Sequence, residues 1–241
     1  LNIMERGQDL FDITANVLSG MKNVLSEYSP DLVLVHGDTS TTSATAIAAF
    51  YQKIKVGHVE AGLRTGNIYS PFPEELNRQI VSRISNFHFA PTKNAKTNLI
   101  NENISEDKIF VTGNTVIDAL LLVVNKVRKS NYSNSKLNAL SNLKKIILVT
   151  GHRRENFGNG LMEICFALKE LSEKYSDFLI IYPVHLNPNV QRTVNKILSS
   201  ISNIYLIDPL SYLDFIRLMD QSYIILTDSG GIQEEAPSLG K

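Results

Sequence analysis

The sequence lacks several features that define common classes of protein. Its 241 residues include one cysteine, Cys165, which excludes an internal disulfide and a zinc site built from several cysteines. No apolar run approaches the roughly 20 residues that a membrane-spanning helix needs. No basic segment followed by an apolar one opens the chain as a signal peptide would. These absences predict a soluble, cytoplasmic protein.

An excess of charge of one sign is also missing. The 24 Lys and Arg residues balance the 24 Asp and Glu residues, so the formal net charge is zero. Binding to a nucleic-acid backbone or an anionic membrane relies on surplus positive charge, and we therefore expect neither as a partner. Apolar residues make up 43% and charged residues 20%, which is ordinary globular usage and argues against extensive disorder.

Several well-known cofactor and metal motifs are absent. There is no G-x-G-x-x-G fingerprint for a dinucleotide and no G-x-x-x-x-G-K-[ST] phosphate loop. An Asp-x-Asp pair, which could hold a divalent ion on a diphosphate, is missing, and so is an H-E-x-x-H zinc motif. The sequence therefore predicts neither a cofactor nor a metal site.

Short apolar runs alternate with segments of helical periodicity along the chain. The runs predict strands at residues 32–36, 56–59, 86–90, 109–112, 145–150, 178–183, 204–207 and 223–227. The periodic segments predict helices at residues 10–27, 41–52, 74–84, 116–127, 161–175, 190–200 and 212–221, with others ending at residue 100 and beginning near residue 232. Such alternation predicts an α/β fold with parallel sheets and right-handed crossovers.

A polar, low-complexity stretch at residues 129–142 interrupts this alternation, which then restarts. We therefore predict an N-terminal Rossmann-like lobe at residues 1–127, a linker at 128–144 and a C-terminal Rossmann-like lobe at 145–241.

Polar side chains follow the predicted strands, where open parallel sheets bind ligands. In the first lobe these are Asp38 and Glu60, with Glu74 further on. If the strands before Asp38 and Glu60 are neighbours, we expect the two carboxylates to lie about 5–10 Å apart. In the second lobe His152 follows one strand. After another strand, Ser229 and two glycines open a helix whose free N–H groups suit a phosphate.

Each of these residues also has a purely structural interpretation. Asp38 could be the N-cap of the following helix, and Glu74 lies in a first helical turn, where the helix dipole favours acids. His152 could line a loop, Gly-Gly turns are common, and Phe215 could pack a helix. For His36, His58 and His88, which lie in or beside strands, we expect a role in the core or at a sheet edge.

Five motifs occur in an order that resembles one enzyme family. They are His36-Gly37-Asp38-Thr39, His58-Val59-Glu60-Ala61-Gly62-Leu63-Arg64-Thr65, Pro73-Glu74-Glu75-x-Asn77-Arg78, Gly151-His152-Arg153-Arg154-Glu155-Asn156 and Thr227-Asp228-Ser229-Gly230-Gly231-x-Gln233-Glu234-Glu235-Ala236. Together they resemble the non-hydrolysing UDP-N-acetylglucosamine 2-epimerases across nearly the whole chain. The resemblance implies the GT-B architecture, with two Rossmann-like lobes around a cleft.

The resemblance also implies a reaction and a set of site residues. The family interconverts UDP-N-acetylglucosamine and UDP-N-acetylmannosamine by eliminating UDP to 2-acetamidoglucal and adding it back, without a cofactor, and a homodimer is usual. The implied acid/base carboxylates are Asp38, Glu60 and Glu74. His152 is implied as a further catalytic residue, which assists on the diphosphate side. The implied substrate contacts are Arg153, Ser229, Gly230 and Gly231, with Glu235 on the ribose and Phe215 on the uracil.

This chain also departs from the family pattern. The family begins with a strand and a Gly-Thr-Arg-Pro-Glu loop, absent here, and continues beyond the last residue of this chain. We therefore expect a chain truncated at both ends. Three alternatives stay open: a hydrolysing epimerase that releases UDP and N-acetylmannosamine, a GT-B glycosyltransferase, and an inactive UDP-sugar-binding fragment.

Overall fold

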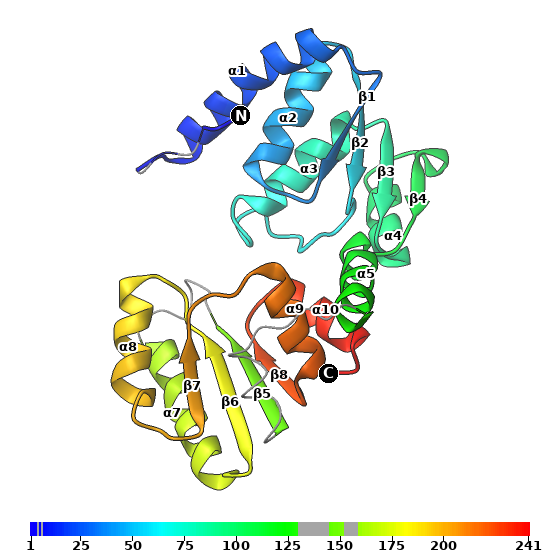
Figure 1. Cartoon of the computed structure of the whole chain (residues 1–241). Coiled ribbons are helices and arrows are strands. Elements are labelled where there is room, and N and C mark those ends of the chain that lie inside the picture. The colour runs from blue at the N-terminus through cyan, green and yellow to red at the C-terminus, as the bar shows by residue number, and fades with distance from the viewer. Residues whose placement is uncertain (4, 6, 130–144, 152–158) are drawn as a thin grey trace. The chain divides into compact units, whose positions relative to one another are not determined.

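The computed structural model in Figure 1 describes residues 1–3, 5, 7–129, 145–151 and 159–241. The chain forms two compact units, Leu1–Thr115 and Val116–Lys241. Among the described residues, no helix has the length and apolar character that a membrane span requires.

The first unit is built around a four-stranded parallel sheet of order β1-β2-β3-β4. Its elements in chain order are α1 (Leu10–Tyr28), β1 (Leu32–His36), α2 (Ser40–Tyr51), β2 (Lys55–Val59), α3 (Glu74–Ile84), β3 (Phe87–Ala90), α4 (Lys93–Asn101), the 3-10 turn η1 (Glu106–Lys108) and β4 (Ile109–Val111). Because spatial order follows chain order, successive strands end side by side at one edge of the sheet.

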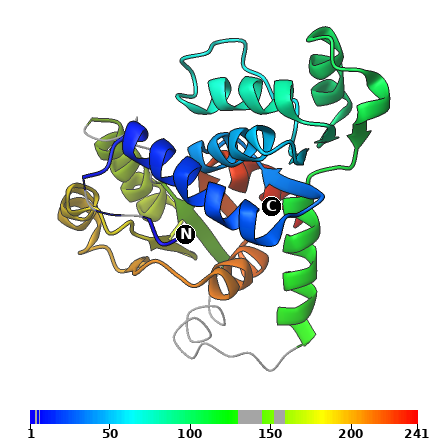
Figure 2. The ribbon, with the colours of Figure 1, turned by 90° about the horizontal axis from the view of Figure 1, so that it is seen from above.

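Helices α1 and α2 show how local signals and packing combine in this unit. Asp9 caps α1 in a capping box with Asp12, and the helix ends where Ser29 adopts a left-handed backbone. Helix α2 buries small side chains, among them Ala46 and Ala49, in a core cluster. The two helices pack against each other, as Figures 1 and 2 show.

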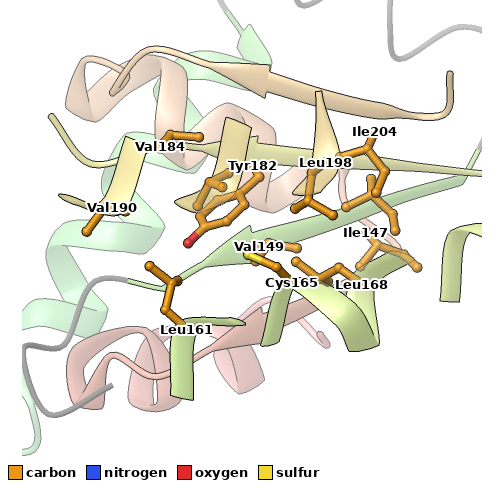
Figure 3. Packing of buried hydrophobic residues seen from close by; sticks show 12 residues of the cluster. Ile147, Val149, Leu161, Cys165, Leu168, Tyr182, Val184, Val190, Leu198 and Ile204 are labelled. Carbon is orange, nitrogen blue, oxygen red and sulfur yellow. The ribbon is translucent and has the colours of Figure 1, made fainter. Parts of the chain in front are cut away.

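The second unit contains a parallel sheet of order β7-β6-β5-β8. Its elements are α5 (Thr115–Lys129), β5 (Lys145–Thr150), α7 (Asn159–Lys174), β6 (Phe178–Pro183), α8 (Pro188–Leu198), β7 (Ile204–Ile207), α9 (Tyr212–Gln221), β8 (Ile224–Thr227) and α10 (Gly230–Ser238). One core cluster joins the sheet to α7 and α8, and Figure 3 shows its side chains around Tyr182 and Cys165. A second cluster joins the sheet to α5, α9 and α10.

All eight predicted strands are present, and the helices lie close to the predicted ranges. The position of α5 differs from the domain prediction, which placed residues through 127 in the first lobe. The buried side chains of Leu120 and Val124 belong to the core of the second unit, and Arg128, which was assigned to the linker, lies within this helix. An ion pair between Arg128 and Asp220, on α9, also ties α5 to this unit. Residues 130–144 of the predicted linker lie outside the described residues.

Candidate functional site

The first group of polar residues lies where β1 and β2 end. These strands are neighbours, and His36 is in register with Val59. Each strand is followed by a residue with a left-handed backbone, Gly37 at φ 71° and Glu60 at φ 69°. Such a backbone is ordinary for glycine and uncommon for glutamate. Both strands therefore turn sharply at the same edge of the sheet, which brings Asp38 and Glu60 to that edge.

Asp38 is not the N-cap of α2, because Thr39 takes that position and its hydroxyl accepts a hydrogen bond from the Thr42 amide. The Asp38 carboxylate binds Arg78 of α3 instead. Both Nε and Nη2 of Arg78 donate to Oδ2, at 2.9 and 2.7 Å. Asn77 donates to the Asp38 carbonyl at 2.8 Å. Among the described residues Oδ1 of Asp38 has no hydrogen-bond partner, so one carboxylate oxygen is held while the other is available.

Glu60 contacts a histidine from the neighbouring strand. Nε2 of His36 lies 3.0 Å from Oε2 of Glu60, and their side chains are 53% and 29% exposed. The pair therefore stands at the surface of the first unit, where a ligand can reach it. His36 belongs to β1, an edge strand of the sheet, which agrees with the expected place in the core or at a sheet edge. The structure adds its direct contact with a candidate acid/base carboxylate.

Helix α3 begins with two glutamates in different environments. Glu74 is half-buried, whereas Glu75 has no exposed surface. Burial works to raise the pKa of Glu75, but hydrogen bonds from the backbone of Thr65 and Gly66 and from Arg78 outweigh it, so the pKa lies below its ordinary value. Glu75 is thus an ionised structural partner of Arg78, and Glu74 is the more accessible acid of the pair.

Two fully buried histidines lie within the strands, just before this edge of the sheet. His58 of β2 and His88 of β3 are in register on neighbouring strands. Burial lowers the pKa of each to about 4, so both imidazoles are neutral near pH 7. Nε2 of His58 lies 2.8 Å from the Gly37 carbonyl and supports the turn that carries Asp38. Their assignment to the core is confirmed.

The second unit contains a pocket of about 290 Å³ where its four strands end. Phe215, an implied uracil contact, and Ser229, an implied phosphate contact, both line this pocket. The remaining lining residues are Thr150, Gly151, Pro183, His185, Pro209, Leu210 and Ile232. The pocket thus combines an aromatic ring and apolar side chains with a few polar groups, as ligand sites do.

Ser229, Gly230 and Gly231 form the start of α10. Ser229 is the N-cap residue, yet its hydroxyl makes no capping hydrogen bond. Its amide donates to the hydroxyl of Thr227, and that threonine also bonds Thr150 on β5. The first N–H groups of a helix have no partner within the helix and point along the positive end of its dipole. This segment can therefore hold an anion such as a diphosphate.

Glu235 lies on the second turn of α10. Burial raises the pKa of its carboxyl, and the neighbouring charge of Glu234 raises it further. His152, an implied catalytic residue, and Arg153, an implied substrate contact, lie outside the described residues. The described residues contain no cluster of His, Cys, Asp and Glu that could hold a metal ion.

Sequence reasoning did not assign a role to Arg78 or Asn77, although both stand in the quoted motif around Glu74. They lie one helical turn beyond Pro73 and Glu74, on the turn of α3 that reaches Asp38. One feature of the sequence could have indicated a role for Arg78: it stands three positions after Glu75, the spacing at which acidic and basic side chains pair on a helix.

The fold and these sites define a class of protein: an α/β chain with two parallel sheets of the GT-B type, which carries candidate ligand groups at the carboxyl ends of its strands. The chain belongs to the UDP-N-acetylglucosamine 2-epimerase family, whose model matches residues 1–241.

Relatives with this name are highly similar over the whole of this chain. It is 57% identical over 245 residues to a UDP-N-acetylglucosamine 2-epimerase of Escherichia coli K12, and 58% identical over 250 residues to one of Campylobacter jejuni. Each alignment covers 100% of this chain and 65% of the relative. The crystal structure of the Neisseria meningitidis enzyme bound to UDP-GlcNAc matches with a TM-score of 0.90 at 51% identity, over 100% of this chain and 66% of that one. The predicted family and fold class are confirmed.

Proposed function

We propose that the protein interconverts UDP-N-acetylglucosamine and UDP-N-acetylmannosamine, and that it does so without hydrolysing the nucleotide sugar. The observation that carries this proposal is the environment of Asp38. Arg78 orients the carboxylate through one oxygen, and the other oxygen has no partner among the described residues. A positioned carboxylate with an available oxygen is suited to proton transfer.

The chemistry of the substrate favours elimination over direct removal of the C2 proton. No carbonyl group adjoins C2, so direct removal would leave a poorly stabilised carbanion. In the elimination, one carboxylate takes the C2 proton while the C1–O bond breaks and its electron pair leaves with UDP. A C1=C2 double bond forms, which gives 2-acetamidoglucal. In the reverse addition, the UDP oxygen bonds to C1 and a carboxylic acid gives a proton to the opposite face of C2.

We assign the acid/base work to Asp38, Glu60 and Glu74, which belong to the first unit. Asp38 and Glu60 follow adjacent strands, and Glu74 opens α3, the helix that also carries Arg78. Three carboxylates in one unit fit a reaction that needs both a proton acceptor and a proton donor. A glycosyltransferase, which transfers the sugar to an acceptor, would leave the presence of all three carboxylates unexplained.

We assign UDP binding to the pocket of the second unit. Phe215 would contact the uracil ring and Glu235 the ribose hydroxyls, while Ser229 and the two glycines after it would hold the diphosphate. His152 and Arg153 would act on the diphosphate side. A firm grip on the departing diphosphate stabilises its charge and keeps it near the glucal for re-addition. No cofactor and no metal ion take part in this scheme, and we expect a homodimer.

Incubation with UDP-GlcNAc in heavy water tests the proposal, with the C2 proton followed by NMR. We expect deuterium at C2 together with UDP-ManNAc signals, and we expect Asp38→Asn to slow the appearance of both at least about a hundredfold. Accumulation of free N-acetylmannosamine and UDP would favour a hydrolysing enzyme. Product that forms only with an added acceptor would favour a glycosyltransferase. UDP binding without exchange at C2 would contradict the epimerase proposal.

A further inference from the structure

The loop of residues 60–65 connects β2 to the segment before α3 and carries Glu60 at its start. Its backbone is left-handed at Glu60, with φ 69°, and again at Gly62, with φ 89°. A glutamate keeps such a backbone only where the surrounding structure holds it there. The contacts of this loop therefore decide where the Glu60 carboxylate stands.

Helix α4 holds the middle of the loop. The side-chain amide of Asn98 donates to the Gly62 carbonyl at 3.0 Å. Gly62 also lies so close to α4 that a Cβ atom there would stand 2.3 Å from the carbonyl oxygen of Ala95. Only glycine fits this approach, and the loop therefore rests directly on the helix.

The C-cap residue of α4, Glu102, holds the end of the loop. Nε of Arg64 donates to Oε1 of Glu102 at 2.6 Å, and Nη2 donates to Oε2 at 2.9 Å. Arg64 also donates to the hydroxyl of buried Ser82 on α3, and its side chain is only 9% exposed. A two-point arginine–carboxylate pair fixes orientation as well as distance.

We propose that Asn98 and Glu102 are positioning residues for Glu60. They do not touch the Glu60 side chain; they hold the loop at Gly62 and Arg64, and so keep the Glu60 backbone left-handed and its carboxylate against His36. The inference rests on the proposed function, because it concerns the acid/base role of Glu60. It assigns a function to α4, whose residues stand outside the five motifs.

Two substitutions and one matched control test this inference. Asn98→Ala removes the donor to Gly62, and Glu102→Gln places an amide N–H against the Arg64 guanidinium. The control is Lys96→Ala, a substitution on α4 itself, which breaks the 2.7 Å ion pair between Lys96 and Glu106 of η1 and, among the described residues, removes no hydrogen bond to the loop. Thermal unfolding is recorded for each variant, so that rates are compared at a temperature where all are folded.

The first readout is exchange of the C2 proton of UDP-GlcNAc with solvent. We expect Asn98→Ala and Glu102→Gln to lower kcat about ten- to a hundredfold, because a small misplacement of an acid/base group has effects of this size. KM should change less than about threefold, since the proposed UDP contacts lie in the second unit. Lys96→Ala should change neither.

The second readout does not depend on activity. The ring resonances of His36 report its contact with Glu60, so we expect both test variants to shift them and Lys96→Ala to leave them in place. Absence of exchange in the parent protein would refute the proposed function, and the His36 resonances would still decide the positioning role. Unchanged His36 resonances in both folded test variants would overturn the inference.

Discussion

Acid should destabilise the first unit because of the buried pair His58 and His88. Each pKa is about 4 in the folded protein, against an ordinary value of 6.5. The cause is burial in both, and the positive charge of one imidazole further lowers the pKa of His88. An imidazole with a lowered pKa binds its proton more readily in the unfolded chain. Its contribution to stability is therefore complete above pH 6.5 and is lost as the pH falls towards 4.

The size of the effect follows from the two pKa values. Each unit by which the pH falls between 6.5 and 4 lowers the free energy of unfolding by up to about 1.4 kcal/mol for one such histidine. Over the whole window each histidine therefore costs up to about 3 kcal/mol, and the pair changes stability by about 3 kcal/mol per pH unit. Since domains are stable by roughly 5–15 kcal/mol in total, this loss is a large part of what holds the unit together.

Urea unfolding followed by circular dichroism at several values between pH 7 and 4.5 measures this slope. His88→Leu removes one imidazole and should reduce the slope by about half. Phe89→Leu, one residue further along β3, serves as the control, because it alters packing but keeps both histidines. It should lower stability by a similar amount at every pH. A slope that His88→Leu leaves unchanged would refute the reasoning.

Three further predictions concern single residues. Gly62→Ala should destabilise the first unit by on the order of 3 kcal/mol in urea unfolding, because the new Cβ would meet the Ala95 carbonyl and φ is positive; unaltered stability would contradict the close approach. Asp38→Asn should stay folded yet lose at least about a hundredfold in C2 exchange, since it cannot accept the proton. Phe215→Ala should weaken UDP binding about tenfold in calorimetry, through the lost stacking of a base on the ring, and Ser229→Ala should weaken it less. If both variants bound UDP as tightly as the parent protein, this would argue against the pocket as the UDP site.

The candidate site could be anticipated from the sequence only in part. The positions of Asp38 and Glu60 after strands are visible in the pattern of apolar runs, and the structure does place both at one edge of the sheet. The role of Arg78 was not visible, because it stands 40 positions from Asp38 and meets it only through the packing of α3. By residue type Asp38 is a somewhat better N-cap than Thr39, so only the backbone geometry shows that Thr39 caps α2.

The sequence by itself determined the order and type of the secondary-structure elements. Buried parallel strands need short apolar runs and helices need apolar residues with a 3.6-residue period, so the local sequence pattern predicts both. The contacts of α4 and α5 depended on tertiary structure. Helix α4 supports a loop more than thirty residues earlier through Asn98, and α5 completes the core of the second unit through Leu120. A side chain's partners depend on which surfaces pack together, and packing is a property of the whole chain that no local pattern contains.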